Sequence, residues 1–472
     1  MTKRNLIWTV TLLALAVILV LARRPVYTPS DSDEMQPLLR PLVETYHLIQ
    51  DKGYHPNEDR DLIRGAAGGM AAAADEYSSY ISPDRAENFQ HRMDGKERGV
   101  GLHLEQVGRQ IRAYQVVPGS PASRATVAIG DAVLTIDGQD VEGMTAAQAE
   151  RLVNDGPSGT VVRLDLVGLD DKVRTVTLDR REFKVESVGG LLRRDDGRWS
   201  YLACTDPPIA YVRVREFVRD TVEEVQVALR QVDAPRGLVL DLRDNPGGQF
   251  SVAVEVADLF LREGPIVTLV DKSGKGAPYM ARPVGSYPEE LRLIVLVDSR
   301  TASAAEIVAG ALAFNRRAVL VGTRTRGKAA IQGMFRLPDG MGEMNLTTAE
   351  FLLGEGRSIG RREGSSDWGV NPHVEMSLSS LEWRQLSRLR SRVEAGVSTR
   401  TAPATRRTGR RRATTAAAGI SAALAPDTDE GALLSLDRQL RKAAELLADP
   451  EAFDAILQRP YPLTAPATGT AE

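Results

Sequence analysis

The stretch LRLIVLVDSRTASAAEIVAGAL (Leu291–Leu312) joins a run of aliphatic residues to an alanine-rich segment. The aliphatic run is typical of a strand that is buried on both faces, and the alanines that follow favour a helix. Ser303 lies at the junction, and with Glu306 it fits the S-x-x-E capping box, which starts helices for purely structural reasons. A serine between a strand and a helix is also where many hydrolases hold a nucleophile. The residues around Ser303 leave both interpretations open.

The segments on both sides repeat this strand-then-helix pattern. GLVLDL (237–242) precedes the turn NPGG and a helix predicted over Phe250–Leu261, and RAVLVG (317–322) follows the alanine-rich segment. Strands and helices that alternate over residues 184–378, with continuous apolar strands, predict a mainly parallel sheet covered by helices. The predicted fold class is therefore α/β, and a chain of 472 residues is expected to form more than one domain.

The remaining regions differ in pattern. Residues 28–97 read as helical, whereas residues 98–183 hold short β-type runs separated by Gly, Pro and Asp, with one helix over Thr145–Asn154. A last amphipathic helix is predicted over Leu433–Leu447. The predicted regions are an N-terminal membrane or signal segment (1–27), a helical region (28–97), a compact β-rich domain (98–183), the α/β core (184–397), a basic low-complexity linker (398–428) and a C-terminal helix with a tail (429–472).

Composition excludes several classes of function. The chain has a net charge of -3, a single cysteine (Cys204) and five scattered histidines. This net charge gives no overall attraction to nucleic acid, one cysteine forms no intrachain disulfide, and the histidines show no metal-binding spacing. We therefore expect no nucleic-acid partner, no metal and no cofactor.

The N-terminus carries an uncharged, mostly apolar segment, Leu6–Ala22, with Lys3 and Arg4 before it and two arginines after it. At 1.5 Å per residue it would span roughly 25 Å, slightly less than a hydrocarbon core of about 30 Å. That length fits a short membrane anchor or the core of a signal peptide, and no A-x-A cleavage site ends it. The sequence favours an uncleaved anchor. We therefore predict a single-pass protein of the cell (inner) membrane with its catalytic part in the periplasm, and a cleaved signal peptide is the alternative.

If Ser303 is a nucleophile, it needs a base, because a free hydroxyl is protonated at neutral pH. The turns after GLVLDL, after the aliphatic run and after RAVLVG could converge, because ligand sites in parallel sheets form at the carboxyl ends of strands. The α/β region holds only His373, which lies outside these three turns. Lys328 precedes the apolar run Ala329–Ile331, and burial there would lower the pKa of its amine. Gln332, four residues later, could orient that amine. In the structural alternative, Lys328 is a surface lysine and Gln332 is on the polar face of a strand.

Two further groups of residues suggest anion binding. Ala304 is the first residue after Ser303 in the predicted helix, so its N–H is unpaired within the helix, and Gly248 of NPGG could bring a second N–H close to the same point. Together they could form an oxyanion hole. In RGVGLHL (98–104), glycines at 99 and 101 could expose N–H groups to a carboxylate, although such pairs more often only make a turn.

The order of DLRDNPGG, TASAAEIVAGAL and RAVLVGTRTRGKAAIQ resembles the carboxyl-terminal processing peptidases, also called tail-specific proteases. The resemblance covers roughly residues 35–395 and implies a serine–lysine endopeptidase with a crotonase/ClpP-like protease core and an embedded PDZ domain. It implies that Ser303 is the nucleophile, Lys328 the general base and Gln332 the residue that positions the lysine. Gly248 and Ala304 match the oxyanion pair.

Residues 98–183 then resemble the PDZ domain. The resemblance implies that a substrate's C-terminus adds to the domain as a strand. Its carboxylate would bind the N–H groups of Val100, Gly101 and Leu102, and its last side chain would lie near Leu104 and Leu152.

We therefore expect a serine endopeptidase that recognises protein C-termini through a PDZ domain and cleaves through an acyl-enzyme. Its expected partners are protein or peptide substrates with free C-termini and, through the N-terminal segment, a membrane. A homo-oligomer is left open. The alternatives are a catalytically silent PDZ scaffold that binds protein tails, and a hydrolase of small acyl or amide substrates on the same residues.

Overall fold

The computed structural model describes residues 36–55, 57–117, 119–168, 171–194, 196–394 and 429–461. These residues divide into two compact units. The first unit comprises the chain up to Phe89 together with Asp271–Ser273 and Ala330–Glu350, and the second comprises the rest. The predicted anchor over 6–22 and the basic linker over 398–428 lie outside the described residues.

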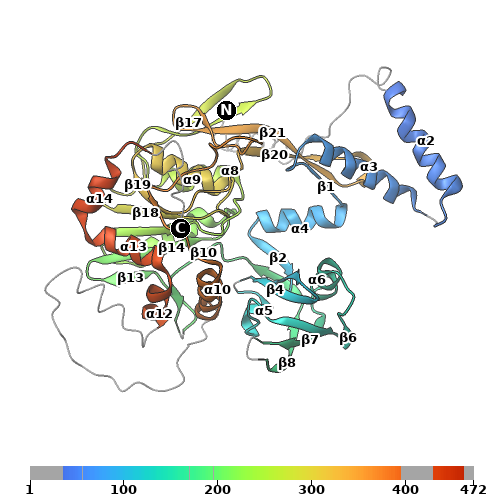
Figure 1. The fold of residues 1–472 in the computed structure, drawn as a ribbon, viewed down its shortest axis with the longest axis horizontal. Coiled ribbons are helices and arrows are strands. Elements are labelled where there is room, and N and C mark those ends of the chain that lie inside the picture. Colours follow the sequence, from blue (N-terminus) through green and yellow to red (C-terminus); the bar gives the residue numbers. More distant parts are fainter. Residues whose placement is uncertain are drawn as a thin grey trace, which may run out of the picture. The chain divides into compact units, whose positions relative to one another are not determined.

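Among the described residues, the first unit combines helices α2 (Gln36–Lys52) and α3 (Asp59–Ala74) and the first part of α4 (Pro83–Met93) with a small antiparallel sheet (Figure 1). Its sheet is formed by β1 (Ser79–Ile81), β20 (Ala330–Arg336) and the first part of β21 (Glu343–Leu353), and β21 pairs with both of the others. Strand β1 and strand β20 are far apart in the sequence, so this unit is assembled from separate stretches of the chain.

The predicted β-rich domain is an antiparallel sheet with the strand order β3-β4-β5-β7-β8. Its helix α6 (Ala146–Asn154) begins with a capping box between Thr145 and Gln148. The sheet and helix enclose an apolar core to which alternate strand residues contribute. The other elements of this domain are β3 (Leu102–Val107), β4 (Gln110–Val116), α5 (Pro121–Arg124), β5 (Ala132–Ile136), β6 (Gln139–Asp140), β7 (Val161–Val167) and β8 (Val173–Asp179).

Strand β2 (Lys96–Gly99) pairs antiparallel with β9 (Arg181–Lys184), so the segments that enter and leave this domain lie side by side. The boundaries predicted at residues 98 and 183 fall inside these two strands. Helix α4 (Pro83–Met93) precedes β2.

The second compact unit also contains a larger sheet. It is parallel, as the sequence predicts, over β14, β15, β18, β19 and β23. Its central strands are buried along their whole length, which accounts for their continuous apolar sequences. The strands are β14 (Pro208–Val214), β15 (Gly237–Asp241), β18 (Arg292–Val297), β19 (Ala318–Gly322) and β23 (Val374–Glu375), with β10 (Val188–Gly189) and β13 (Leu202–Thr205) antiparallel to β14. The helices between them are α7 (Thr221–Arg230), α8 (Phe250–Asp258) and α9 (Ala304–Phe314).

Smaller strands complete the second unit. Strand β16 (Pro265–Asp271) pairs with β17 (Gly276–Met280), β11 (Leu192–Arg193) pairs with β12 (Trp199–Ser200), and β22 (Arg357–Ser358) pairs with the end of β21.

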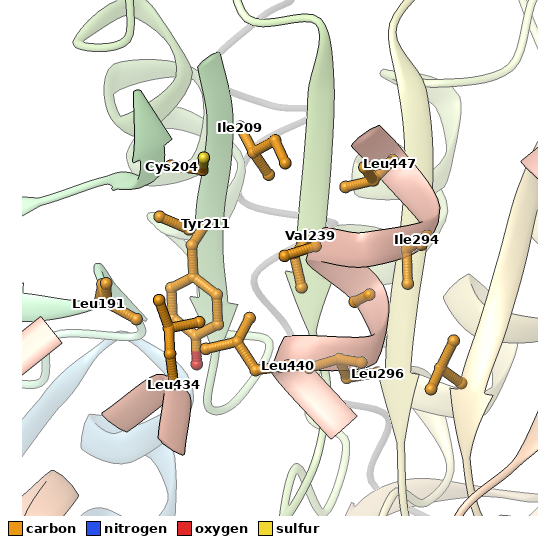
Figure 2. Close-up of a cluster of buried hydrophobic side chains, with 14 of the residues drawn as sticks. Leu191, Cys204, Ile209, Tyr211, Val239, Ile294, Leu296, Leu434, Leu440 and Leu447 are labelled. Carbon is orange, nitrogen blue, oxygen red and sulfur yellow. The ribbon is translucent and has the colours of Figure 1, made fainter. Parts of the chain in front are cut away.

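One face of the parallel sheet is covered by the C-terminal helices (Figure 2). Leu440 and Leu447 pack against sheet residues that include Tyr211, Val239 and Ile294 in a single apolar cluster. These helices are α10 (Ser380–Glu394), α12 (Asp429–Leu436), α13 (Arg438–Ala448) and α14 (Pro450–Leu457). The sequence therefore returns to the core after the basic linker, and the core is not complete without its last helices.

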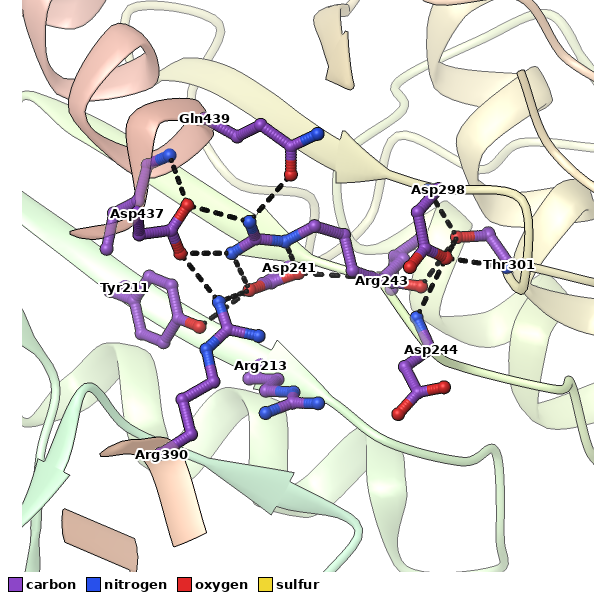
Figure 3. Close-up of polar contacts among 12 residues, drawn as sticks. Tyr211, Arg213, Asp241, Arg243, Asp244, Asp298, Thr301, Arg390, Asp437 and Gln439 are labelled. Carbon is purple, nitrogen blue, oxygen red and sulfur yellow. Dashed lines mark hydrogen bonds and ion pairs between the residues drawn. The ribbon is translucent and has the colours of Figure 1, made fainter. Parts of the chain in front are cut away.

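The single helix predicted over Leu433–Leu447 is two helices, broken at Asp437. The Asp437 carboxylate caps α13 by accepting a hydrogen bond from the Leu440 N–H at 3.0 Å. It also binds the buried Arg243 guanidinium through both of its oxygens, at 2.8 Å each (Figure 3). An aspartate whose side chain bonds to a nearby N–H and to a buried cation favours a helix end over a helix interior. The spacing of apolar residues does not show these contacts, so it predicted one continuous helix.

Among the residues that the structure describes, no helix is long and apolar enough to cross a membrane. This finding contradicts the predicted single-pass inner-membrane localisation with a periplasmic catalytic part, and the prediction is corrected accordingly. It rested on the length and hydropathy of residues 6–22, on the charges that flank them and on the lack of an A-x-A cleavage site.

Candidate active site

Three turns meet at the carboxyl end of the parallel sheet, following β15, β18 and β19. The Ala302 N–H of the second turn donates to the Asn245 carbonyl of the first at 2.9 Å, and the Arg326 N–H of the third donates to the Thr301 carbonyl at 3.0 Å. The Thr301 hydroxyl donates to the Leu242 carbonyl at 2.9 Å. The turns that the sequence predicts to converge are therefore joined by hydrogen bonds.

Ser303 occupies a strained position at the start of α9. Its backbone has φ 55° and ψ -119°, a conformation that residues with a side chain rarely adopt. The turn NPGG packs directly against it, because a Cβ atom built on Gly247 would lie 2.9 Å from the Ser303 Cβ. Only glycine fits there. The strain and the close approach of a glycine turn are typical of a serine held for chemistry rather than of a simple helix cap.

The carboxylate of Glu306 fastens the serine turn to the lysine turn. One of its oxygens accepts hydrogen bonds from the N–H groups of Ser303 and Lys328, at 2.8 and 2.9 Å. The other accepts from the Thr325 hydroxyl at 2.5 Å and from the Gly327 N–H at 2.7 Å. In the sequence, Glu306 is recognisable only as the second half of a capping box, and its contacts with the turn that carries Lys328 leave no local signal there.

Glu306 is fully buried, and burial raises the pKa of its carboxyl group, while the four donors that surround it act in the opposite direction. All four groups donate to Glu306, and three of them are main-chain N–H groups that cannot accept, so the ionised carboxylate satisfies this site.

Lys328 is half-buried, and burial lowers the pKa of its amine because desolvation disfavours the charged form. The positive charge of the neighbouring Arg326 lowers this pKa further, whereas Glu306 raises it. Ala329, which follows, is buried at 3% exposure. Both leading effects favour a neutral amine, the form that can accept a proton.

Two backbone N–H groups border the serine. Gly248 has φ 136°, and a Cβ atom at this position would lie 2.2 Å from the Phe217 carbonyl oxygen, so glycine is required. The Phe217 N–H donates to the Gly247 carbonyl at 2.8 Å, which fixes the turn. Within the described residues, the N–H groups of Gly248 and Ala304 have no protein acceptor, which leaves them available to an anion.

A family model for "Peptidase family S41" matches residues 208–376, and a model for "PDZ domain" matches residues 112–168. The "Carboxyl-terminal-processing protease" of Picosynechococcus sp. is 34% identical over 316 residues, which cover 65% of this chain and 73% of that protein. The chain belongs to the carboxyl-terminal processing peptidase family.

A second relative of this peptidase, the "Carboxy-terminal-processing protease" of Bartonella bacilliformis, is 29% identical over 363 residues, which cover 75% of this chain and 80% of that protein. Among solved structures, the "photosystem II D1 C-terminal processing protease" aligns with a TM-score of 0.47 and 27% identity, covering 75% of this chain and 92% of that one.

Gln332 lies in β20, which belongs to the first compact unit, whereas Ser303 and Lys328 belong to the second. Its Nε2 is 3.5 Å from the Thr347 hydroxyl, and that hydroxyl donates to Asp75 at 3.1 Å. Asp75 also accepts from the Ser78 hydroxyl at 2.6 Å. The side chain of Gln332 is thus next to a polar cluster of its own unit.

His373 has a structural role in the peptidase. Its Nδ1 accepts a hydrogen bond from the Leu320 N–H at 2.9 Å, and burial lowers its pKa to about 4. An imidazole whose Nδ1 already accepts a main-chain hydrogen bond in the core is a poor base for Ser303.

The residues predicted to bind a substrate tail lie on the PDZ domain of the peptidase. Val100 and Leu102 are fully buried, Leu104 is 4% exposed and packs in the core of the domain, and Leu152 is 41% exposed. Gly101 has φ 71°, and a Cβ atom there would clash with Ser120 at 2.3 Å. The loop that precedes β3 therefore requires glycine at this position.

Proposed function

We propose that this peptidase is a serine endopeptidase in which Ser303 is the nucleophile and Lys328 is the general base. The observation that carries the proposal is the Glu306 carboxylate, which binds the N–H groups of both residues at 2.8 and 2.9 Å. One buried anion thereby ties the backbone of the serine to the backbone of the lysine. A lone helix cap would not need the second contact.

In the proposed reaction, the neutral amine of Lys328 accepts the proton of the Ser303 hydroxyl as its oxygen attacks the peptide carbonyl. The N–H groups of Gly248 and Ala304 stabilise the negative charge on the carbonyl oxygen. The lysine then protonates the leaving amine, which gives an acyl-enzyme and releases the C-terminal product. Water, deprotonated by the same lysine, attacks the ester and frees Ser303.

The family resemblance supports three finer assignments within this proposal. Gln332 is assigned as the residue that positions the lysine amine, and the core is assigned to the crotonase/ClpP-like type. The substrates are assigned as proteins with free C-termini, which the PDZ domain binds as an added strand. Relatives bear the name carboxyl-terminal-processing protease, and this proposal extends that activity to the present chain.

The test is cleavage of a disordered protein such as casein by the full-length chain. Wild type is expected to cleave it, and Ser303→Ala and Lys328→Ala are each expected to lose cleavage while unfolding at the wild-type temperature. The alternative of a silent PDZ scaffold predicts no cleavage by any of the three proteins. Cleavage by Ser303→Ala at the wild-type rate would refute the assignment of the nucleophile.

A further inference from the structure

Helix α6 packs along β3, and main-chain groups of β3 and of the residues just before it face this helix. Along a strand, the main-chain groups of alternate residues point to the same side. The residues between them point toward β4; the carbonyl of Gly101, just before β3, for example, accepts from the Val117 N–H at 2.9 Å. The groups concerned are the Val100 N–H, the Leu102 carbonyl and the Leu104 N–H. A peptide strand added to β3 would have to pair with these three groups.

All three groups are already paired with side chains of α6. Asn154 uses both ends of its amide: its Oδ1 accepts from the Val100 N–H at 3.2 Å, and its Nδ2 donates to the Leu102 carbonyl at 2.7 Å. The Glu150 carboxylate accepts from the Leu104 N–H at 3.0 Å. The two side chains thus repeat the acceptor–donor–acceptor pattern that the main chain of a tail would present.

Both side chains are held in place by further contacts. The second oxygen of Glu150 lies 3.1 Å from Nδ1 of His103, and Nε2 of His103 lies 3.3 Å from Glu97. Burial disfavours the imidazolium, but these two carboxylates outweigh that effect and raise the pKa of His103 to about 9, so the ring is positively charged at neutral pH. Asn154 sits against the end of β2, since a Cβ atom on Gly99 would lie 2.9 Å from its Oδ1.

We infer that Glu150 and Asn154 decide which C-termini bind this domain, because they stand in for the tail and a tail binds only by displacing them from the edge of β3. The inference rests on the proposed function, in which the PDZ domain receives substrate tails. The main chain of a suitable tail must replace all three contacts. The carboxylate would take the place of the Asn154 oxygen at Val100.

The geometry also specifies what the tail must offer. With its carboxylate at the Val100 N–H and its chain antiparallel to β3, the N–H of its last residue reaches the Leu102 carbonyl. The carbonyl two residues earlier then accepts from the Leu104 N–H, because strand partners recur every second residue. A tail that ends in proline lacks the N–H that Leu102 requires. Such a tail cannot fully replace Asn154.

The experiment measures binding of a fluorescein-labelled peptide that ends in Ala-Val-Ala-Val with a free carboxylate to the full-length chain. All proteins carry Ser303→Ala, so that binding is measured without cleavage. Asn154→Ala and Glu150→Ala are each expected to bind the probe roughly three- to tenfold more tightly, since each removes an internal competitor that makes modest net hydrogen bonds. Arg151→Ala, on the exposed side of α6, is the matched control and is expected to bind as the parent does.

A second measurement does not depend on substitutions in α6. Hydrogen exchange at the Val100 and Leu104 amides of the free chain is expected to be slow, and a probe ending in Ala-Val-Ala-Pro is expected to bind roughly tenfold more weakly than the first probe. Unchanged or weaker binding by both α6 variants, or fast exchange at both amides, would refute the role given to Glu150 and Asn154 and would leave tail recognition by the PDZ domain standing. No binding of the probe by any protein would overturn tail recognition and the inference together, whereas the casein assay tests catalysis separately.

Discussion

Replacement of Glu306 by glutamine tests the contact on which the site is built. The carboxylate accepts four hydrogen bonds, from Ser303, Thr325, Gly327 and Lys328. A glutamine keeps one acceptor oxygen, which serves two of these donors, and turns an N–H₂ group toward the other two. Two hydrogen bonds to a charged group are lost, each contributing about 1.5–3 kcal/mol, so the free energy of unfolding should fall by about 3–6 kcal/mol.

Activity should fall as well, because the two turns would no longer be held together. A misplacement of about 1 Å in a catalytic group reduces the rate by about two orders of magnitude. The assays are chemical denaturation of the full-length chain and the initial rate of casein cleavage. The initial rates of both proteins are measured at a temperature at which the variant is folded.

Glu382→Gln is the matched control for this experiment. Glu382 also closes a capping box, since it accepts from the Ser379 N–H at 2.8 Å while the Ser379 hydroxyl accepts from the Glu382 N–H at 3.2 Å, but it lies at the start of α10 near the surface. This variant should change stability little and leave cleavage intact. If Glu306→Gln behaved as Glu382→Gln does in both assays, the role given to the buried carboxylate would be refuted.

Two further predictions follow from charges near the site and in the core. Arg326→Gln removes a positive charge that lowers the pKa of Lys328, so this pKa should rise. The cleavage rate should then begin to increase at a higher pH than in wild type. An unchanged pH–rate profile would argue against Lys328 as the base. Asp437→Asn leaves the buried Arg243 with one carboxylate in place of two and should cost about 3–5 kcal/mol of unfolding free energy in thermal or chemical denaturation. The arginine partners of Asp437 lower the pKa of its carboxyl group in the folded protein. Its contribution to the free energy of unfolding is therefore complete above the pKa of the unfolded chain and is lost as the pH falls through the pKa of the folded protein. Wild type and variant should reach equal stability only in acid.

The parallel sheet and the converging turns could be predicted from the sequence because their signals are local. Strand β18 is buried from Leu293 to Val297, which needs an unbroken apolar run, and the serine turn follows it directly. The choice of Lys328 over His373 followed from counting the available bases, and the structure gives His373 another role.

Other features depend on partners distant in the sequence and were not predictable in this way. The second role of Glu306 depends on a turn about twenty residues away, and the break at Asp437 depends on Arg243. The pairing of Asn154 with the edge of β3 likewise joins residues 52 positions apart. A capping box, an apolar period and a glycine pair each describe only a few neighbouring residues, so they predict where an element begins and not what its side chains reach.

The most direct measurement of the central proposal is the site of covalent labelling by a serine-reactive probe such as a fluorophosphonate. The full-length chain is treated with the probe, digested and analysed by mass spectrometry. We expect one modified residue, Ser303, and a labelling rate that falls roughly tenfold or more in Lys328→Met, since the hydroxyl then has no base. Labelling at another serine, or labelling of Ser303 at the same rate with and without Lys328, would contradict the proposal.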